Sequence, residues 1–203
     1  MYSIVYILPE IFLSLSIMFL LMLGVFIKKS FNLVYLLTIL SLIFAIALIL
    51  NQPDEIIKIF NDSYIIDRLS IFMKVLTLSF CLFVLLSSKD YVKSNSIDKI
   101  EYPIIILSST LGMVLMISSY DLMIFYLGLE LQSLSLYILA SFKRNNERST
   151  EAGLKYFVLS ALASGLLLYG CSLIYGFTGS TNFEIISTNL NEANTGAVFG
   201  IVF

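Results

Sequence analysis

The chain alternates long apolar runs with short polar segments, and this alternation predicts its structural elements. Each long run is close to twenty residues, the length that an α-helix needs to cross the hydrocarbon core of a bilayer. A further apolar run at 196–203 is too short to cross. The complete runs lie at about 7–27, 33–50, 69–88, 102–119, 122–142 and 152–175. The pattern predicts an all-α, polytopic transmembrane helix bundle with six complete spans and the start of a seventh, forming one membrane domain over residues 1–203.

Composition supports a membrane protein and excludes several other classes. Of the 203 residues, 59% are hydrophobic and 13% are charged, and the mean hydropathy is +0.95, so a bilayer must replace water as the solvent. The net charge of −2 offers no basic surface for nucleic acid. With no His and two Cys, histidine metal sites and four-sulfur zinc or iron–sulfur sites are excluded. Cys81 and Cys171 are expected at depths that differ by roughly 12 Å, too far apart for a disulfide.

Lysine and arginine divide unevenly between the two ends of the predicted bundle. The segments 28–32, 89–103 and 143–151 fall at one end and carry eight of these residues, whereas the other end carries two, Lys58 and Arg68. The positive-inside rule then places the N-terminus outside. No basic segment precedes the first apolar run, so this run is expected to be a retained anchor rather than a signal peptide. We expect a multi-pass protein of the mitochondrial inner membrane, synthesised inside the organelle, with the bacterial plasma membrane as the alternative.

Four ionisable side chains lie inside the predicted spans, where each is costly unless it is paired, hydrated or able to reach the interface. Glu10 follows Pro9 in the first turn of its helix, where a carboxylate suits the positive end of the helix dipole, so a structural cap is the expected role. Lys74 lies near the outer end of its helix and within reach of Asp67, so it is expected to extend toward the interface. The other two side chains are candidates for function.

Glu130 lies nine residues after Asp121 and twelve before Phe142, roughly 13 and 18 Å from the two ends of its span. A side chain at this depth cannot reach water, so the carboxyl group must be protonated or must face a cation or a hydrated interior. Either state makes Glu130 a candidate proton carrier, with a buried structural acid as the alternative. Nearby polar side chains are candidates for ordering water beside it: Tyr126, Ser133 and Tyr137 on the same helical face, and Gln132 on a neighbouring stripe.

Lys155 opens the last complete span, one turn after Glu151. Two roles are open for it: an ordinary i, i+4 ion pair with Glu151 at the interface, or a step in a proton path. Glu130 and Lys155 differ in depth by about 13 Å, and an extended lysine covers only about half of that distance. A direct salt bridge between them is therefore excluded, and water or another ionisable group must intervene.

Two long stretches carry a resemblance to a known family. They are LGLELQSL at 127–134 and STEAGLKY at 149–156, and shorter matches lie at 9–10, 119–122 and 170–176. The chain resembles, most strongly over residues 100–183, the antiporter-like membrane subunits of respiratory complex I, NADH:ubiquinone oxidoreductase. The type is the one called subunit 2 in mitochondria and subunit N in bacteria.

The resemblance implies that Glu130 matches the family's intramembrane glutamate on the fifth helix and Lys155 the lysine at the start of the sixth, both associated with the proton path. It implies a subunit of an NADH:ubiquinone reductase that couples electron transfer from NADH to quinone to proton pumping. No redox chemistry is then expected on this chain, with NAD, FMN, iron–sulfur clusters and ubiquinone bound by other subunits. The implied partners are the other membrane-arm subunits and membrane lipids.

Length separates this chain from the family, whose members normally have about fourteen helices with inverted repeats. The seventh helix, on which the family carries the lysine that partners the glutamate, is absent. We therefore expect either a fragment of a longer protein or a split-gene product with a separately encoded C-terminal half. Two other functions stay open: a membrane subunit of a multi-subunit cation/proton antiporter, and a non-conducting structural subunit in which Glu130 remains neutral.

Overall fold

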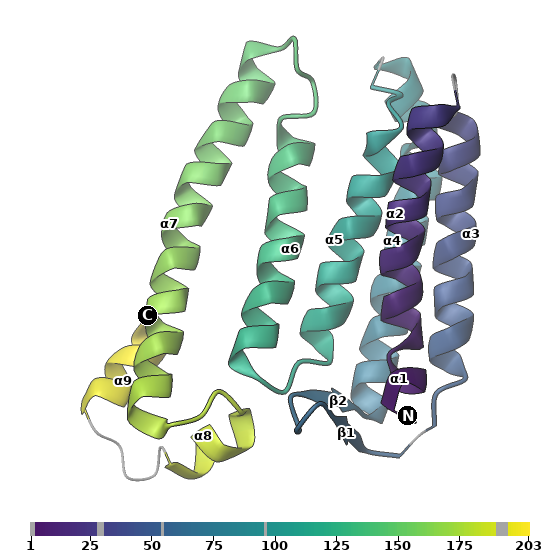
Figure 1. The fold of residues 1–203 in the computed structure, drawn as a ribbon. Coiled ribbons are helices and arrows are strands. Elements are labelled where there is room, and N and C mark those ends of the chain that lie inside the picture. Colours follow the sequence, from purple (N-terminus) through teal and green to yellow (C-terminus); the bar gives the residue numbers. More distant parts are fainter. Residues whose placement is uncertain (1–2, 28–30, 54, 96, 190–194) are drawn as a thin grey trace.

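Six long helices form the body of the molecule (Figure 1). The computed structural model describes residues 3–27, 31–53, 55–95, 97–189 and 195–203. In that part of the chain, five helices are long and apolar enough to cross a membrane, and α5 is a shorter apolar helix of 17 residues that stands among them. The long helices are α2 (Leu8–Phe26), α3 (Phe31–Leu50), α4 (Arg68–Ser94), α5 (Glu101–Ile117), α6 (Leu122–Ala140) and α7 (Glu147–Thr178).

The six helices correspond to the six predicted apolar runs, so the predicted helix bundle is confirmed. The main differences are at two ends, because α4 continues to Ser94 and α7 begins at Glu147. Both extensions consist largely of polar residues, which an apolar-run criterion does not count as helix. Polar N-caps define where three helices begin. Asp67 accepts a hydrogen bond from the backbone of Ser70, and Asp121 and Asn146 cap α6 and α7 in the same way.

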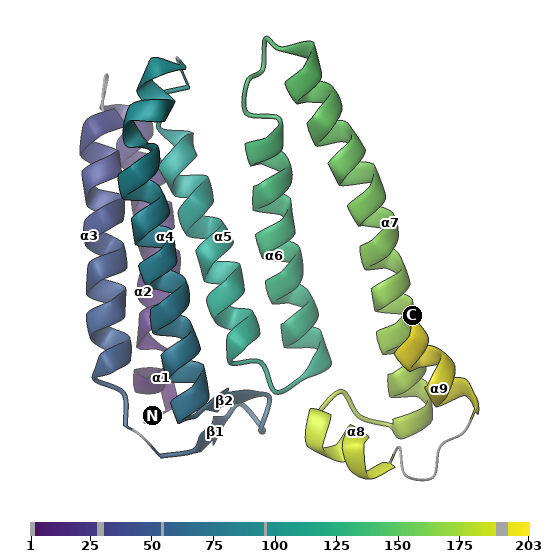
Figure 2. The same cartoon turned by 180° about the vertical axis from the view of Figure 1, so that it is seen from behind.

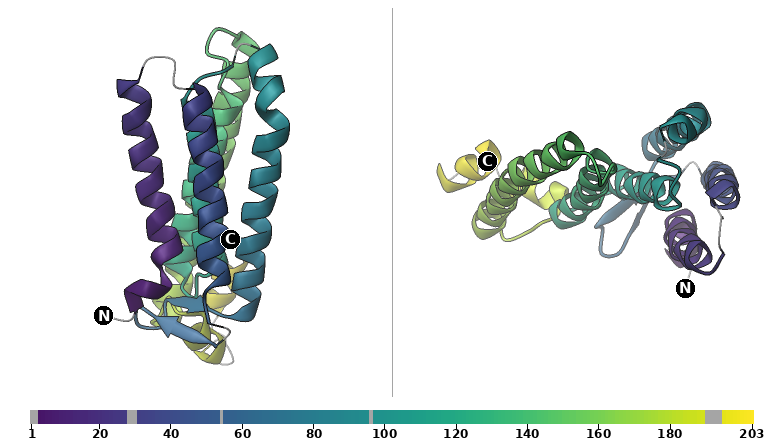
Figure 3. Two further views of the ribbon diagram at one scale, coloured as in Figure 1. Left: turned by 90° about the vertical axis from the view of Figure 1, so that its right-hand side faces the viewer. Right: turned by 90° about the horizontal axis from the view of Figure 1, so that it is seen from above.

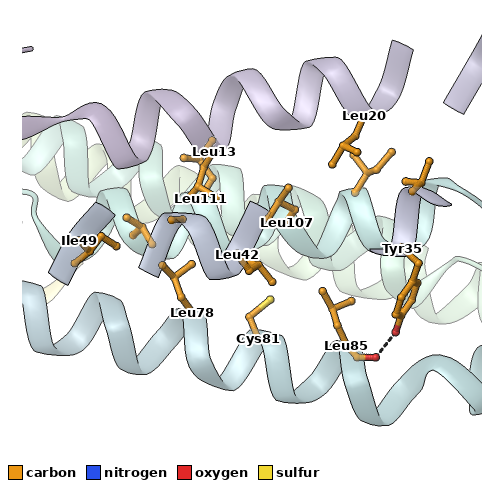
Figure 4. Close-up of a cluster of buried hydrophobic side chains, with 14 residues drawn as sticks. Leu13, Leu20, Tyr35, Leu42, Ile49, Leu78, Cys81, Leu85, Leu107 and Leu111 are labelled. Atoms are coloured by element: carbon orange, nitrogen blue, oxygen red, sulfur yellow. Dashed lines mark hydrogen bonds between the residues drawn. The ribbon is translucent and has the colours of Figure 1, made fainter. Parts of the chain in front are cut away.

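Helices α2, α3, α4 and α5 pack around a shared apolar core, with α6 against α5 and α7 outermost (Figures 2 and 3). Leu13, Leu42, Leu78 and Leu107, one from each of the four helices, meet in this core (Figure 4). Cys81 lies in the same cluster, whereas Cys171 is on the distant α7, and both are free thiols. The expectation that they form no disulfide is confirmed.

A small β-hairpin closes one end of the bundle, and the sequence pattern did not predict it. Strands β1 (Ile57–Ile59) and β2 (Tyr64–Ile66) pair antiparallel, and their turn places three consecutive non-glycine residues at positive φ. The hairpin is tied to two further connections, because Tyr64 forms a bridge to Ser119, and Asn182 donates to the carbonyl of Asp62. A three-residue strand is too short to show a periodic pattern.

Three short helices complete the described chain: α1 (Ser3–Tyr6), α8 (Phe183–Asn189) and α9 (Thr195–Val202). Helix α8 follows the turn at the end of α7. The start of a seventh span, expected at 196–203, is an eight-residue helix, α9, that folds back against α7. Gly170 and Gly200 allow this contact, since a Cβ added at Gly170 would lie 2.8 Å from the carbonyl oxygen of Gly200.

The connections alternate between the two ends of the bundle as predicted. The hairpin, the α5–α6 turn and α8 lie at one end together with the N-terminus, and the α4–α5 and α6–α7 connections lie at the other (Figure 1). Lys28 and Lys29, which belong to the predicted basic group, lie outside the described residues. The assignment of the basic end to the inner side of the membrane stays a prediction.

An ion pair ties the hairpin to α8. The Nζ of Lys58 binds the carboxylate of Glu184 and also lies 4.8 Å from the centre of the Tyr120 ring. The hydrogen bond and the positive charge of Lys58 lower the pKa of Glu184, and Glu184 raises the pKa of Lys58. Both side chains are largely in contact with solvent, so the pair adds little to global stability.

We expect the attachment of α8 to weaken in acid. Because the pKa of Glu184 is lower in the folded protein than in the unfolded chain, the contribution of the pair is complete above the unfolded value and is lost as pH falls through the folded value. Amide hydrogen exchange over 183–189, corrected for its intrinsic pH dependence, should therefore accelerate on acidification. Glu184→Gln should exchange at the faster rate throughout, and the exposed Glu147→Gln is the control. If the exchange rate of 183–189 in Glu184→Gln depended on pH in the same way as in the unmodified protein, the result would contradict this account.

Candidate functional site

Glu130 is the ninth residue of the 19-residue helix α6, so its Cα lies at the middle of the helix, as the sequence predicted. The side chain is half-buried, and its Oε1 is a buried oxygen with no hydrogen-bond partner. A carboxylate oxygen in this position loses the solvation that it would have in water and gains no donor in return. Protonation, or a donor from outside the described residues, would remove that cost.

Of the four predicted neighbours of Glu130, Tyr126 interacts with its side chain. The other three bind the helix backbone or take part in helix packing. Tyr126 interacts with Glu130 and also with Ser164 of α7. Ser133 donates its hydroxyl to the backbone carbonyl oxygens of Leu129 and Glu130, at 2.9 and 3.2 Å. Tyr126 is therefore the neighbour best placed to exchange a proton with Glu130.

Tyr137 and Gln132 lie away from the carboxylate. The Tyr137 ring is buried against Tyr156 and Phe157 of α7, with ring centres 4.9 and 5.7 Å away. Gln132 is on the side of α6 that packs against α5, where its backbone lies next to Gly112. These two residues shape the helix contacts on either side of Glu130.

Lys155 forms an ion pair with Glu151, with Nζ 2.6 Å from Oε1. The two side chains are 71% and 62% exposed within this chain, so the ordinary i, i+4 pair that the sequence left open is the arrangement observed. Lys155 precedes Tyr156, whose ring meets the Tyr137 ring edge to face, and Tyr137 lies seven residues beyond Glu130, or about 10 Å along the helix. The ion pair found for Lys155 among the described residues is with Glu151, and its place in a proton path stays a prediction.

A close backbone contact between α5 and α6 sets the position of the Glu130 segment. A Cβ added at Gly112 would lie 2.7 Å from the carbonyl oxygen of Gly128, and a Cβ at Gly128 would lie 3.0 Å from the backbone nitrogen of Met116. Gly128 is two residues before Glu130. The absence of side chains at both crossing points therefore lets the helices approach at the depth of the candidate site.

Glu10, Lys74 and Tyr64 form a second charged cluster, which the sequence analysis did not predict. The Nζ of Lys74 lies 2.7 Å from Oε1 of Glu10 and 3.0 Å from the hydroxyl of Tyr64, which itself donates to Glu10 Oε1 at 2.6 Å. Lys74 is fully buried and Glu10 is 3% exposed. Burial, and then the neighbouring Glu10, raise the pKa of Tyr64, so its hydroxyl stays protonated.

Two expectations are thereby corrected. Glu10 does lie in the first turn of α2, but its side chain makes no cap hydrogen bond and turns to Lys74 instead. Lys74 does not extend to the interface, and Asp67, its expected partner, accepts from the backbone of Ser70 at the start of α4. A lysine and a glutamate separated by 64 positions give no local signal of pairing, which depends on how α2 and α4 pack.

Substitution of the crossing glycines should destabilise the protein. Gly112→Ala and Gly128→Ala place a methyl group against backbone that cannot move without separating α5 from α6, which should cost about 1–3 kcal/mol. Gly165→Ala on α7 is the matched control, because a Cβ there has nothing within 4 Å and alanine favours a helix. Thermal unfolding in detergent measures the difference. Equal melting temperatures for Gly128→Ala and Gly165→Ala would show that the crossing is not tight.

Loss of one partner from the buried pair should cost more than loss of both charges. Lys74→Met leaves Glu10 buried without its cation, and we expect a loss of about 3–5 kcal/mol. Lys74→Met combined with Glu10→Gln removes both charges and should recover most of this loss, since Tyr64 can still donate to the glutamine. The same unfolding measurement applies. Additive losses in the double variant would mean that the two side chains are not coupled in the folded protein.

Comparison with known proteins gives consistent results. Residues 119–203 match the family model described as "NADH:quinone oxidoreductase/Mrp antiporter, TM". NADH-quinone oxidoreductase subunit N of Pelagibacter ubique is 60% identical over 98% of this chain and 42% of its own length. Subunit N of Bartonella bacilliformis is 50% identical over 99% of this chain and 42% of its own. The chain thus spans about two-fifths of the length of these curated relatives.

Solved structures agree with the sequence matches. A chain of respiratory complex I from Thermus thermophilus aligns over 96% of this chain and 43% of its own length, with a TM-score of 0.74 and 27% identity. An archaeal membrane-bound sulfane sulfur reductase shares the fold, with a TM-score of 0.80 and 22% identity over 97% of this chain and 42% of its own. In sequence and fold, the chain is therefore a multi-pass membrane relative of NADH-quinone oxidoreductase subunit N, corresponding to the N-terminal part of that subunit.

Proposed function

We propose that this chain belongs to a proton-translocating membrane subunit of an NADH:quinone oxidoreductase, and that Glu130 accepts and releases the proton. The observation that carries the proposal is the buried, unpartnered carboxylate oxygen of Glu130 at the middle of α6. A fixed structural acid would have both of its oxygens satisfied, whereas a proton carrier must exist in two protonation states.

The route of the proton follows from the surroundings of Glu130. Tyr126 interacts electrostatically with Glu130 and with Ser164 of α7, and its hydroxyl is proposed to pass a proton between the two helices. Toward the basic end, Tyr137 and its stacked rings occupy the α6–α7 contact, which leaves the open side of α7 for water or for further helices of the complete protein. The unpaired oxygen of Glu130 would form its hydrogen bond with such a water molecule or with a side chain of a further helix.

Lys155 is proposed to deliver protons at the basic end. Its pair with Glu151 is exposed, and both side chains line a pocket together with Arg144. An exposed lysine–glutamate pair is held weakly, so Lys155 can exchange Glu151 for water or for a group of a neighbouring helix. Its separation from Glu130 requires that water or another ionisable side chain complete the path.

The coupled electron transfer would take place outside this chain. We propose that NAD, FMN, iron–sulfur clusters and quinone are bound by other subunits, and that the partners are the other membrane-arm subunits, membrane lipids and the C-terminal helices of the same subunit, on this chain or another. The relatives named above are bacterial, which favours the bacterial plasma membrane over the mitochondrial alternative.

Glu130→Gln tests the function directly. In native membranes containing the complete protein, we expect fewer protons moved per electron while the amount of assembled protein is unchanged, because glutamine fits the site but carries no exchangeable acid proton. Glu101→Gln, an exposed acid in the first turn of α5, should pump normally. Unimpaired pumping in Glu130→Gln would overturn the proposal. Loss of the protein from the membrane in both variants would indicate a folding effect, and Tyr126→Phe would then provide the test.

The same membranes can distinguish an oxidoreductase subunit from a cation/proton antiporter subunit, which the family description also includes. An oxidoreductase subunit should purify with NADH-oxidising activity that depends on quinone. A cation/proton antiporter subunit should instead acidify vesicles in response to a sodium gradient without NADH. The curated relatives favour the first outcome.

A further inference from the structure

The Glu10–Lys74–Tyr64 cluster lies apart from the face that carries Glu130. Its members come from α2, α4 and the hairpin, and the cluster sits at the hairpin end of the bundle. Helix α5 stands between this group of helices and α6, and Glu130 interacts with Tyr126, which faces α7. The cluster is therefore a separate site and is not used by the proton path proposed above.

The cluster is incompletely satisfied. Oε1 of Glu10 accepts from Lys74 and from Tyr64, while Oε2 is buried and has no hydrogen-bond partner. A fixed structural ion pair in hydrocarbon normally satisfies both carboxylate oxygens, because each unpaired one retains its desolvation cost. The side chain of Glu10 is 3% exposed, so bulk water does not supply the missing donor.

We propose that Glu10, Lys74 and Tyr64 form a second proton-exchange site, in which the cluster alternates between a charged pair and a neutral pair. In the charged form, Lys74 is an ammonium and Glu10 a carboxylate. In the neutral form, Glu10 carries the proton and Lys74 is an amine. The neutral form removes the cost of the unpaired, charged oxygen. A proton that enters from the hairpin side and binds the Lys74 amine gives a cationic state with Glu10 protonated and Lys74 charged, and release of the Glu10 proton to the same side restores the charged pair.

The proton step balances through the tyrosine. The Tyr64 O–H bond breaks as its proton moves to Oε1 of Glu10, and an N–H bond of Lys74 breaks as its proton moves to the Tyr64 oxygen. The geometry permits this, because Tyr64 lies within hydrogen-bond distance of both groups, 2.6 Å from Glu10 and 3.0 Å from Lys74. Tyr64 is neutral before and after the step, in keeping with its raised pKa.

Other charged and polar groups face the cluster from two elements. Asp67, at the start of α4, acts on Lys74 electrostatically. Ser118, in the α5–α6 turn, contacts Tyr64. Tyr64 also belongs to the hairpin that bridges to Ser119, so the cluster adjoins the connections at the end of the bundle, where a proton can be exchanged with water.

Infrared difference spectroscopy of the complete protein in native membranes tests the site without reference to pumping. We expect a carboxylic-acid C=O band that appears and disappears with pH and is lost in Glu10→Gln. The band should shift in Tyr64→Phe, which keeps both charges but removes the relay. Glu184→Gln, an exposed acid at the same end of the bundle, should leave the band unchanged. A carboxylate signal from Glu10 that does not change with pH would overturn the proposal.

Proton pumping provides a second measurement. A role of the cluster in translocation rests on the proposed function, whereas the infrared test does not. Glu10→Gln and Tyr64→Phe should both lower the number of protons moved per electron. Normal pumping in both variants alongside impaired pumping in Glu130→Gln would overturn a role in translocation for this site but leave the proposed function intact. Normal pumping in Glu130→Gln would instead overturn the proposed function, while the infrared result would still decide whether the cluster exchanges protons. Should Glu10→Gln fail to assemble, Tyr64→Phe decides.

Discussion

The absence of water inside the hydrocarbon governs where this chain places polar atoms. Backbone groups are satisfied within helices, and most serine and threonine hydroxyls donate to carbonyl oxygens one turn earlier in the same helix, as Ser133 and Thr38 do. Against this background, two buried carboxylate oxygens without a partner are exceptions, one on Glu130 and one on Glu10. Both proposals concern these two atoms, because an unsatisfied charge in such surroundings is costly to keep without a function.

The two acids use different surroundings. Glu10 is enclosed by a cation and a hydroxyl from other elements, and both of them bind Oε1 and leave Oε2 without a partner. Glu130 has a tyrosine beside it but no cation among the described residues, and its helix is positioned by the backbone contact at Gly112 and Gly128 together with the Tyr137 ring contacts to α7. The first arrangement holds a proton between fixed groups, and the second leaves one side of the acid available to a further helix.

The sequence predicts the helices and the depth of their residues well, because both depend on the length of apolar runs. The position of Glu130 at the centre of α6 and its separation from Lys155 followed from counting residues at 1.5 Å each. The Glu10–Lys74 pair could not be predicted in this way, since it depends on which helices are neighbours. The resemblance to a known family identified Glu130 and Lys155, but nothing in the local pattern marked Tyr64 as the third member of a buried cluster.

The hairpin gives the two ends of the bundle different mechanical properties. At its own end, backbone hydrogen bonds join Tyr120 to Ser63 and Leu122 to Thr181, which links three connections that are distant in sequence. At the basic end, the described contacts between connections are a 3.5 Å hydrogen bond from Lys143 to Asn95 and the packing of the Tyr102 and Phe142 rings. The connections between helices are therefore joined more extensively at the hairpin end than at the basic end. A lateral force on the bundle should displace the helix ends at the basic end more than those at the hairpin end.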